Sequence, residues 1–163
     1  MSTKDFLKKI KDEDIEYVDV RFTDTRGKLQ HVTIVSDLVD EDFVEEGFMF
    51  DGSSIAGWKS IEASDMKLML DTDTAYVDPF YAEKTICVHC SVVEPDTGEA
   101  YERDPRGTAQ KAEAYLKASG IGDVAYMGPE AEFFLFDNVK FSNSINKVSY
   151  EVDASDASWN TDT

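Results

Sequence analysis

The sequence predicts an α+β protein that begins with a compact open sheet and continues into a second α+β unit. Three observations indicate this fold class. Residues 17–35 hold two runs of alternating apolar and polar side chains around the turn sequence DTRG (24–27), which is typical of a β-hairpin. Further β-type runs follow at 65–80 and 84–104. A helical pattern then begins at Asp104, so that helix and strand succeed each other in the second part.

The first part also contains two short helical segments. Phe6, Leu7 and Ile10 recur among lysines at helical spacing, which predicts a short amphipathic helix before the hairpin. After the hairpin, residues 36–47 indicate a helical turn region that ends at Gly47. We expect four or five strands to form a compact open sheet in this part, and the short helix at 36–47 to lie across it.

The rest of the first part alternates between irregular and extended sequence. Residues 48–60 combine glycines, serines and large aromatic side chains without a period of 2 or 3.6, so we expect a structured loop. Residues 65–80 predict a strand, an acidic turn and a short second strand that is stopped by Pro79. A strong strand follows, and it ends in the turn sequence EPDTG (94–98).

The second part opens with clear helix signals. Asp104 is suited to the N-cap, Pro105 to the first helical position, and Gly120 to the C-terminal stop. The apolar stripe of this helix is expected from Ala109, Ala112, Tyr115 and Leu116.

Strands are predicted at 124–128, 130–141 and 147–152, and the domain boundary is placed near residues 98–104. The second part is too short to cover both faces of its aromatic strand, because small domains bury too little surface. We therefore expect the chain to stop partway through a domain.

Composition narrows the possible partners. The 163 residues carry 34 acids and 16 bases, a net charge of −18, which disfavours nucleic acid and anionic membranes as partners. No apolar run approaches the ~20 residues of a membrane span. The N-terminus lacks a secretory apolar region, and the chain lacks a disulfide framework, so a cytoplasmic location is expected.

Cys87 and Cys90 form a C-x-x-C motif around His89 in ICVHCSV. Redox motifs of this kind open a helix, whereas this one lies in a β-branched run, and no second cysteine pair completes a zinc site. We interpret the pair as two reduced thiols of a strand, with Cys87 and Cys90 on opposite faces.

The stretch GPEAEFFLFD (128–137) places two acids in an aromatic run. In a strand, Glu130 and Glu132 point to the same face as Phe134 and Phe136. A buried charge without a partner is costly, so divalent cations, Arg or Lys should neutralise the pair. On the pattern alone, two exposed carboxylates of an edge strand remain an alternative.

Four stretches in this order resemble the bacterial type I glutamine synthetases: MFDGSSIAGW (49–58), EASDM (62–66), YERDPRGTAQKAEAYLKASGI (101–121) and GPEAEFFLFD. The resemblance covers nearly the whole chain. It implies a β-grasp domain at 13–98, followed at 104–163 by the incomplete N-terminal part of the catalytic domain.

The resemblance also implies an activity. The family joins ammonia to the side-chain carboxylate of glutamate through a γ-glutamyl phosphate made from ATP. Two divalent cations, Mg²⁺ or Mn²⁺, hold the phosphates and the substrate in each active site. The enzymes are homododecamers, and each active site is shared between neighbouring subunits.

The family's functional residues map onto matching positions. By resemblance, Glu132 binds the metal near glutamate and Glu130 the metal near the nucleotide phosphates. Asp51 binds ammonium and takes its proton in the neighbouring subunit's site, and Ser54 and Asp65 are candidate substrate-binding residues. The nucleotide and glutamate arginines of the family have no counterpart here, so the chain alone is expected to be inactive.

Several alternatives remain open from the sequence. Trp58 fits either core packing or a wall between subunits, and Arg103 and Arg106 suit structural salt bridges. The whole chain also fits a ligase that joins glutamate to another amine, although the intact MFDGSSIAGW stretch favours ammonia. A non-catalytic β-grasp oligomerisation module is the third possibility.

Overall fold

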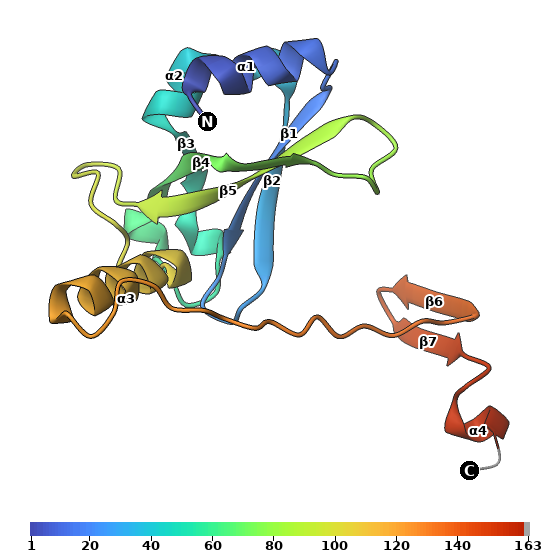
Figure 1. Ribbon diagram of the computed structural model, residues 1–163. Coiled ribbons are helices and arrows are strands. Elements are labelled where there is room, and N and C mark those ends of the chain that lie inside the picture. The colour runs from blue at the N-terminus through green and yellow to red at the C-terminus, as the bar shows by residue number, and fades with distance from the viewer. Residues whose placement is uncertain (162–163) are drawn as a thin grey trace. The chain divides into compact units, whose positions relative to one another are not determined.

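The computed structural model describes residues 1–161 of the 163. The chain forms two compact units, Met1–Ala125 and Tyr126–Thr163, and each is described by itself (Figure 1). The first unit contains a mixed five-stranded sheet with helices, which confirms the α+β class. No helix in the described part of the chain combines the length and the apolar character needed to cross a membrane.

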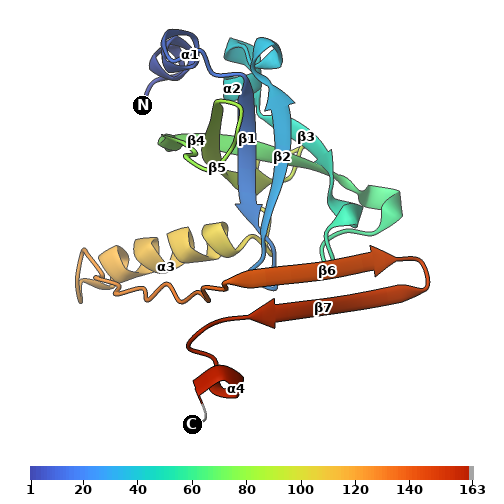
Figure 2. The same ribbon diagram turned by 90° about the vertical axis from the view of Figure 1, so that its right-hand side faces the viewer.

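The sheet of the first unit has the strand order β2-β1-β5-β4-β3. β1 and β5 pair in parallel at the centre, and the other neighbours are antiparallel. The predicted hairpin is confirmed, since β1 and β2 run side by side in register from Tyr17 opposite Val35 to Thr23 opposite Leu29 (Figure 2). The strands are β1 (Tyr17–Thr23), β2 (Leu29–Val35), β3 (Phe48–Asp51), β4 (Asp65–Val77) and β5 (Thr85–Val93).

The core lies on one face of this sheet. Alternate residues of the two central strands point there, including Val18 and Val20 of β1 and Val88 of β5, all fully buried. The helices α1 (Thr3–Asp12) and α2 (Glu41–Glu46) lie next to each other and contact β4 (Figure 1). Phe6 and Ile10 of α1 are buried, so the predicted amphipathic helix is confirmed.

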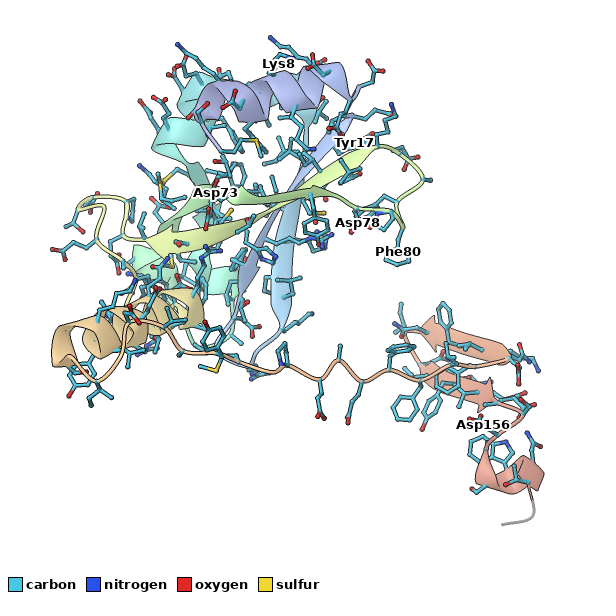
Figure 3. The ribbon with its side chains drawn as sticks, in the orientation of Figure 1. Lys8, Tyr17, Asp73, Asp78, Phe80 and Asp156 are labelled. Atoms are coloured by element: carbon cyan, nitrogen blue, oxygen red, sulfur yellow. The ribbon has the colours of Figure 1, made fainter. Side chains whose placement is uncertain are left out.

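The opposite face of the central strands carries a buried polar network. Asp19 is fully buried, and its carboxylate accepts hydrogen bonds from Arg21 Nε at 2.6 Å and Thr33 Oγ1 at 2.7 Å. His31 Nδ1 lies 2.7 Å from the same carboxylate. Arg21 also donates to Asp78, which lies on the connection from β4 to β5 (Figure 3), at 3.1 Å. The network therefore links β1 and β2 with this connection.

The pKa of Asp19 reflects two opposing effects. Burial favours the neutral acid, but hydrogen bonds from Arg21, His31 and Thr33 favour the carboxylate and lower its pKa below the ordinary value. The buried charge is consequently compensated inside the chain.

Two extended segments differ from the sequence-based prediction. Phe48–Asp51 was expected within a loop but forms the edge strand β3, because its backbone pairs with β4 from Leu68 to Asp65. The predicted strand, acidic turn and second strand are one strand, β4, in which the pairing register with β5 shifts between Asp71 and Tyr76. The acidic residues therefore sit in a strand irregularity rather than in a turn.

The predicted helix of the second part is confirmed as α3 (Pro105–Ser119). The Asp104 side chain caps it by accepting from Arg106 N, and Gly120 ends it in the left-handed conformation at φ 70°. Most of the predicted apolar stripe faces solvent: Ala109, Ala112 and Tyr115 are exposed and Leu116 is half-buried, whereas Gly107 is the buried residue of the helix.

The two cysteines lie in β5 as predicted. Both are buried free thiols. Because successive side chains of a strand point to opposite faces, Cys87 lies on the polar face and Cys90 in the core. Burial raises the pKa of Cys87 to about 11 and that of Cys90 to about 12, so both are protonated at neutral pH.

The second unit consists of a hairpin and one helical turn. β6 (Asn138–Ser144) pairs antiparallel with β7 (Lys147–Asp153), and α4 (Ser158–Thr161) follows (Figure 2). The strand predicted at 147–152 is confirmed. The strands predicted at 124–128 and for 130–136 are wrong, because no described strand pairs with this backbone, and an extended segment without partners cannot form a ladder. Pairing begins at Asp137, whose N–H donates to Asp153 O of β7 at 2.8 Å directly before β6 starts.

Candidate functional site

The first candidate residue, Asp51, ends the edge strand β3 and starts a short turn. Its Oδ1 accepts hydrogen bonds from Ser53 N at 2.8 Å and Ser53 Oγ at 2.6 Å. The side-chain and backbone donors of Ser53 lower the pKa of Asp51, with a smaller contribution from Ser64. Asp51 is therefore an exposed carboxylate that stays ionised at neutral pH, and its side chain also caps the short turn that follows it.

Asp65 lies directly opposite Asp51 in the antiparallel pair of β3 and β4. Directly opposed residues have Cβ atoms about 4.5–5.5 Å apart on the same face, and like charges there repel each other. Both side chains are exposed. The structure thus brings together two of the predicted site residues, in an arrangement that a cation stabilises by reducing the repulsion.

Gly52 follows Asp51, and its φ is not in the left-handed region, so the position does not need glycine for its backbone conformation. A Cβ at this position would lie 2.6 Å from Met66 Cγ and Sδ, and Gly52 N donates to Ser64 O at 2.7 Å. The glycine is required because the turn after Asp51 packs directly on β4.

A cluster of aromatic rings packs next to the turn that follows Asp51. The Trp58 ring lies 5.5 Å from Phe22, 6.2 Å from Phe50 and 5.3 Å from Tyr101, measured between ring centroids. Trp58 is 6% exposed. Within the chain, the structure therefore assigns core packing to Trp58, which was one of the two alternatives.

A hollow of about 550 Å³ lies beside this acidic edge. Its lining includes Met49 from β3, Asp65 from β4 and Ser64 from their connection, and Glu94 and Asp96 from the turn after β5. Lys59 crosses the lining to bind both oxygens of Glu94, at 2.7 and 2.8 Å. The surface next to Asp65 is thus mainly anionic, with one cation already paired.

Ser54 is the remaining predicted residue of this turn. It is exposed at the end of the short 3₁₀ turn Gly52–Ser54, whereas its neighbour Ser53 makes both hydrogen bonds to Asp51. Its assignment to substrate stays a prediction.

Glu130 and Glu132 belong to the second unit. Both are exposed in a segment without strand pairing, and none of the ion pairs found in residues 1–161 uses either of them. The rings of Phe134 and Phe136 stack with centroids 6.1 Å apart and an interplanar angle of 11°, so alternate side chains share one side in this part of the segment. The shared face of Glu130 and Glu132 themselves stays a prediction.

The glutamates fit a divalent metal in kind but not in number. Carboxylate oxygens are the ligands that Mg²⁺ and Mn²⁺ prefer, but these ions take about six ligands, and two side chains cannot supply them. Among the described residues, no group of three or more His, Cys, Asp or Glu side chains is placed to hold a metal ion.

Sequence reasoning missed the residues that fasten the turn from a distance. Tyr101 OH donates to Trp58 O at 3.0 Å, and Arg103 Nη1 donates to Gly57 O. Arg103 was expected in a salt bridge, but here it binds a backbone carbonyl, whereas Arg106 does pair with Asp71 as expected. No local sequence pattern predicts such contacts, because each joins residues far apart in the chain.

The fold and the site define a β-grasp sheet with an exposed acidic turn, followed by the start of a second domain. The family model described as "Glutamine synthetase, beta-Grasp domain" matches residues 14–95, and the one described as "Glutamine synthetase, catalytic domain" matches residues 102–162. The chain therefore belongs to the glutamine synthetase family.

Curated relatives support this assignment. The chain is 75% identical to a glutamine synthetase of Cereibacter sphaeroides over 97% of its own length and 34% of the relative's. It is 70% identical to one of Rhodobacter capsulatus over 99% of its own length and 36% of the relative's. The chain thus spans about a third of the length of these relatives.

Solved structures share the fold. A cryo-EM structure of Plasmodium falciparum glutamine synthetase matches 94% of this chain and 30% of its own, with a TM-score of 0.71 and 23% identity. A structure titled "GmaS/ADP complex-Conformation 1" matches 70% of this chain and 26% of its own, with a TM-score of 0.63 and 17% identity. At these identities the likeness concerns the fold.

Proposed function

We propose that this chain is the N-terminal part of an enzyme that joins ammonia to the side-chain carboxylate of glutamate, using ATP and a γ-glutamyl phosphate. The observation that carries the proposal is the ionised, exposed Asp51, held by Ser53 opposite Asp65 in a chain of the glutamine synthetase family. This acidic pair suits a small cation such as ammonium.

Asp51 performs two steps on ammonium. Ammonium has no lone pair, so it must lose a proton before its nitrogen can attack the acyl phosphate. The carboxylate first attracts the cation, and its lowered pKa keeps it charged for this purpose. One N–H proton then passes to a carboxylate oxygen of Asp51, which leaves ammonia with a free lone pair. This lone pair attacks the carbonyl carbon of the γ-glutamyl phosphate, and the new C–N bond forms as the C–O bond to phosphate breaks. Inorganic phosphate leaves, and the nitrogen loses a second proton to give the amide.

Asp65 and Ser54 complete the substrate-binding side of the proposal. Asp65 adds negative potential next to Asp51 and beside the hollow, which favours a cationic substrate. Ser54 offers an exposed hydroxyl at the same turn.

Glu130 and Glu132 are the proposed metal ligands. Glu132 would contribute to the metal near glutamate and Glu130 to the metal near the nucleotide phosphates, with further ligands outside these two residues. Two Mg²⁺ or Mn²⁺ ions per site supply positive charge that offsets the phosphates during phosphoryl transfer. The chain's own part is to present two oxygen ligands from one extended segment.

The partners follow from the same proposal. The substrates are glutamate, ammonium and ATP, and the protein is a cytoplasmic homo-oligomer, a dodecamer by family likeness. Each active site is shared, so that Asp51 serves the site of a neighbouring subunit. The net charge of −18 argues against nucleic acid and anionic membranes as partners.

The substitution Asp51→Asn tests this proposal in a protein of the relatives' full length that carries this chain. Asparagine keeps the shape but can neither attract a cation by charge nor accept the proton. We expect kcat/KM for ammonium to fall by roughly 10²–10⁴-fold, with the KM for glutamate nearly unchanged. Steady-state kinetics with varied ammonium and varied glutamate measures both.

Asp37→Asn is the matched control, since Asp37 is an exposed acid in a different turn of the same unit. It should leave all constants unchanged. The 163-residue chain alone is the negative reference, and γ-glutamyl transfer by it would contradict the proposed division of the site. Full activity of the Asp51→Asn enzyme at low ammonium would contradict the role of Asp51.

A further inference from the structure

Hydrogen bonds and ring packing from a segment far away in the sequence hold the turn that follows Asp51. We define the Asp51 loop as residues 51–60 and the linker as residues 99–104, which lead from the turn after β5 to helix α3. The contacts between these two segments join the residue proposed to handle ammonium with the entry to the catalytic domain.

The linker is itself held firmly against β5. Tyr101 N donates to Val92 O at 2.9 Å, and Asp104 Oδ2 accepts from Val92 N at 3.1 Å. Asp104 is 1% exposed and also caps α3. Because Tyr101 and Asp104 are both bound to the same residue of a central strand, the position of Tyr101 is fixed relative to the sheet.

Tyr101 contacts the loop through its ring and its hydroxyl. Its ring packs edge-on against Trp58 with centroids 5.3 Å apart, and its hydroxyl donates to Trp58 O at 3.0 Å. The Trp58 ring in turn contacts Phe50, the residue before Asp51. Tyr101 therefore restrains both the backbone that follows the acid and the side chain that supports it.

Two further contacts hold the same stretch. Arg103 donates to Gly57 O, and Gly57 has a φ of 82°, which lies in the region that favours glycine. Lys59 binds Glu94 and lies 5.1 Å above the Tyr101 ring. Three successive loop residues, Gly57 to Lys59, are thus tied to the linker or to the turn that precedes it.

We propose that Tyr101 and Arg103 are positioning residues that hold the carbonyls of Trp58 and Gly57 and thereby fix the Asp51 carboxylate for ammonium. The inference rests on the proposed function, since it names what sets the position of the ammonium-binding acid. Neither residue touches substrate in this scheme. Their effect reaches the reaction through the backbone between Gly57 and Asp51.

The first test measures the loop itself. Tyr101→Phe removes the hydroxyl but keeps the ring, and Arg103→Gln removes the guanidinium from an exposed position. Hydrogen exchange should become faster at the amides of Ile55 and Trp58, which donate within the loop to Gly52 O and Ile55 O. Tyr81→Phe, a hydroxyl deletion in the connection from β4 to β5, is the matched control and should leave these amides unchanged.

The second test measures catalysis in a protein of the relatives' full length. Loss of one hydrogen bond that orders the loop should raise the KM for ammonium roughly 3–10-fold. The KM values for glutamate and ATP and the kcat at saturating ammonium should stay near those of the wild type. A general loss of structure would instead lower kcat and alter all three KM values.

The outcomes separate the two proposals. Unchanged exchange in the loop, or faster exchange without a change in the KM for ammonium, overturns the positioning role. If the wild-type protein does not use ammonium at all, the proposed function fails, while the exchange data still decide whether the linker holds the loop. Should Tyr101→Phe fold poorly by circular dichroism, the exposed Arg103→Gln variant alone decides the outcome by the same measurements.

Discussion

The Asp51 loop and the segment that carries Glu130 and Glu132 contain the same kinds of residue, but they differ in how far the rest of the chain buries their aromatic side chains. Both combine acids with aromatic side chains. In the loop, Trp58 is 6% exposed and packed between rings from three other segments. In the glutamate segment, Phe133 is 78% and Phe134 86% exposed, and the acids have no ion-pair partner among residues 1–161.

The chain thus fixes the position of the Asp51 half of the proposed site but not that of the glutamate half. The β-grasp sheet buries its own core, so the acid at its edge has a defined position and a lowered pKa. In residues 126–161, the second unit has a two-stranded hairpin with largely exposed faces and one helical turn, and a hairpin of this size is marginal in water. An aromatic segment of this kind gains its structure only when a neighbouring surface covers it.

The largest expected effect compares aromatic truncations in the two regions. Trp58→Ala should lower the free energy of unfolding of the 163-residue chain by about 3–5 kcal/mol, because a buried ring leaves a cavity. Phe133→Ala, in the exposed segment, should change it by no more than about 0.5 kcal/mol. Urea unfolding followed by circular dichroism measures both. Equal effects would show that the two regions do not differ in packing.

A second comparison concerns acids with and without partners. Asp19→Asn should cost about 1.5–3 kcal/mol at pH 7, because the carboxylate accepts charge-assisted hydrogen bonds from Arg21. Glu132→Gln, with an exposed side chain, should have no measurable effect.

The effect of Asp19→Asn should depend on pH in one direction. The folded-state pKa of Asp19 is lowered, so its stabilisation is complete above the unfolded-state pKa of about 3.9 and is lost as the pH falls through the lower folded value. The difference between wild type and Asp19→Asn should therefore shrink below about pH 4. A difference that stays constant from pH 7 to pH 3 would contradict the assigned role of the carboxylate.

The smallest expected effect compares two glycines. Gly52→Ala places a methyl group against buried Met66 and should cost about 1–3 kcal/mol, with faster hydrogen exchange at Ser53. Gly128→Ala meets no atom within 4 Å and should be close to neutral. Thermal unfolding gives the two values, and a neutral Gly52→Ala would mean that the turn after Asp51 can move away from β4.

Several features of the site could be predicted from the sequence because they arise from residues close together in the chain. The resemblance of MFDGSSIAGW to the family pointed to Asp51, and in the structure Ser53 binds its carboxylate from two residues away. The opposition of Asp51 and Asp65 could not be predicted, because it depends on the pairing of β3, whose four residues are too few to show a clear alternation. The loop contacts of Tyr101 and Arg103 escaped for the same reason, as hydrogen bonds to distant carbonyls leave no trace in a local pattern.

By itself, the sequence determined the elements whose cause is local. Asp104 and Gly120 bound a helix through capping chemistry, and DTRG closes a hairpin between alternating runs. The three-dimensional structure was needed to show which aromatic residues are buried, that Asp51 lies opposite Asp65, and that residues 130–136 have no strand partner. The physical reason is that burial and strand pairing depend on surfaces contributed by distant parts of the chain, and a run of residues carries no record of whether such a surface is present.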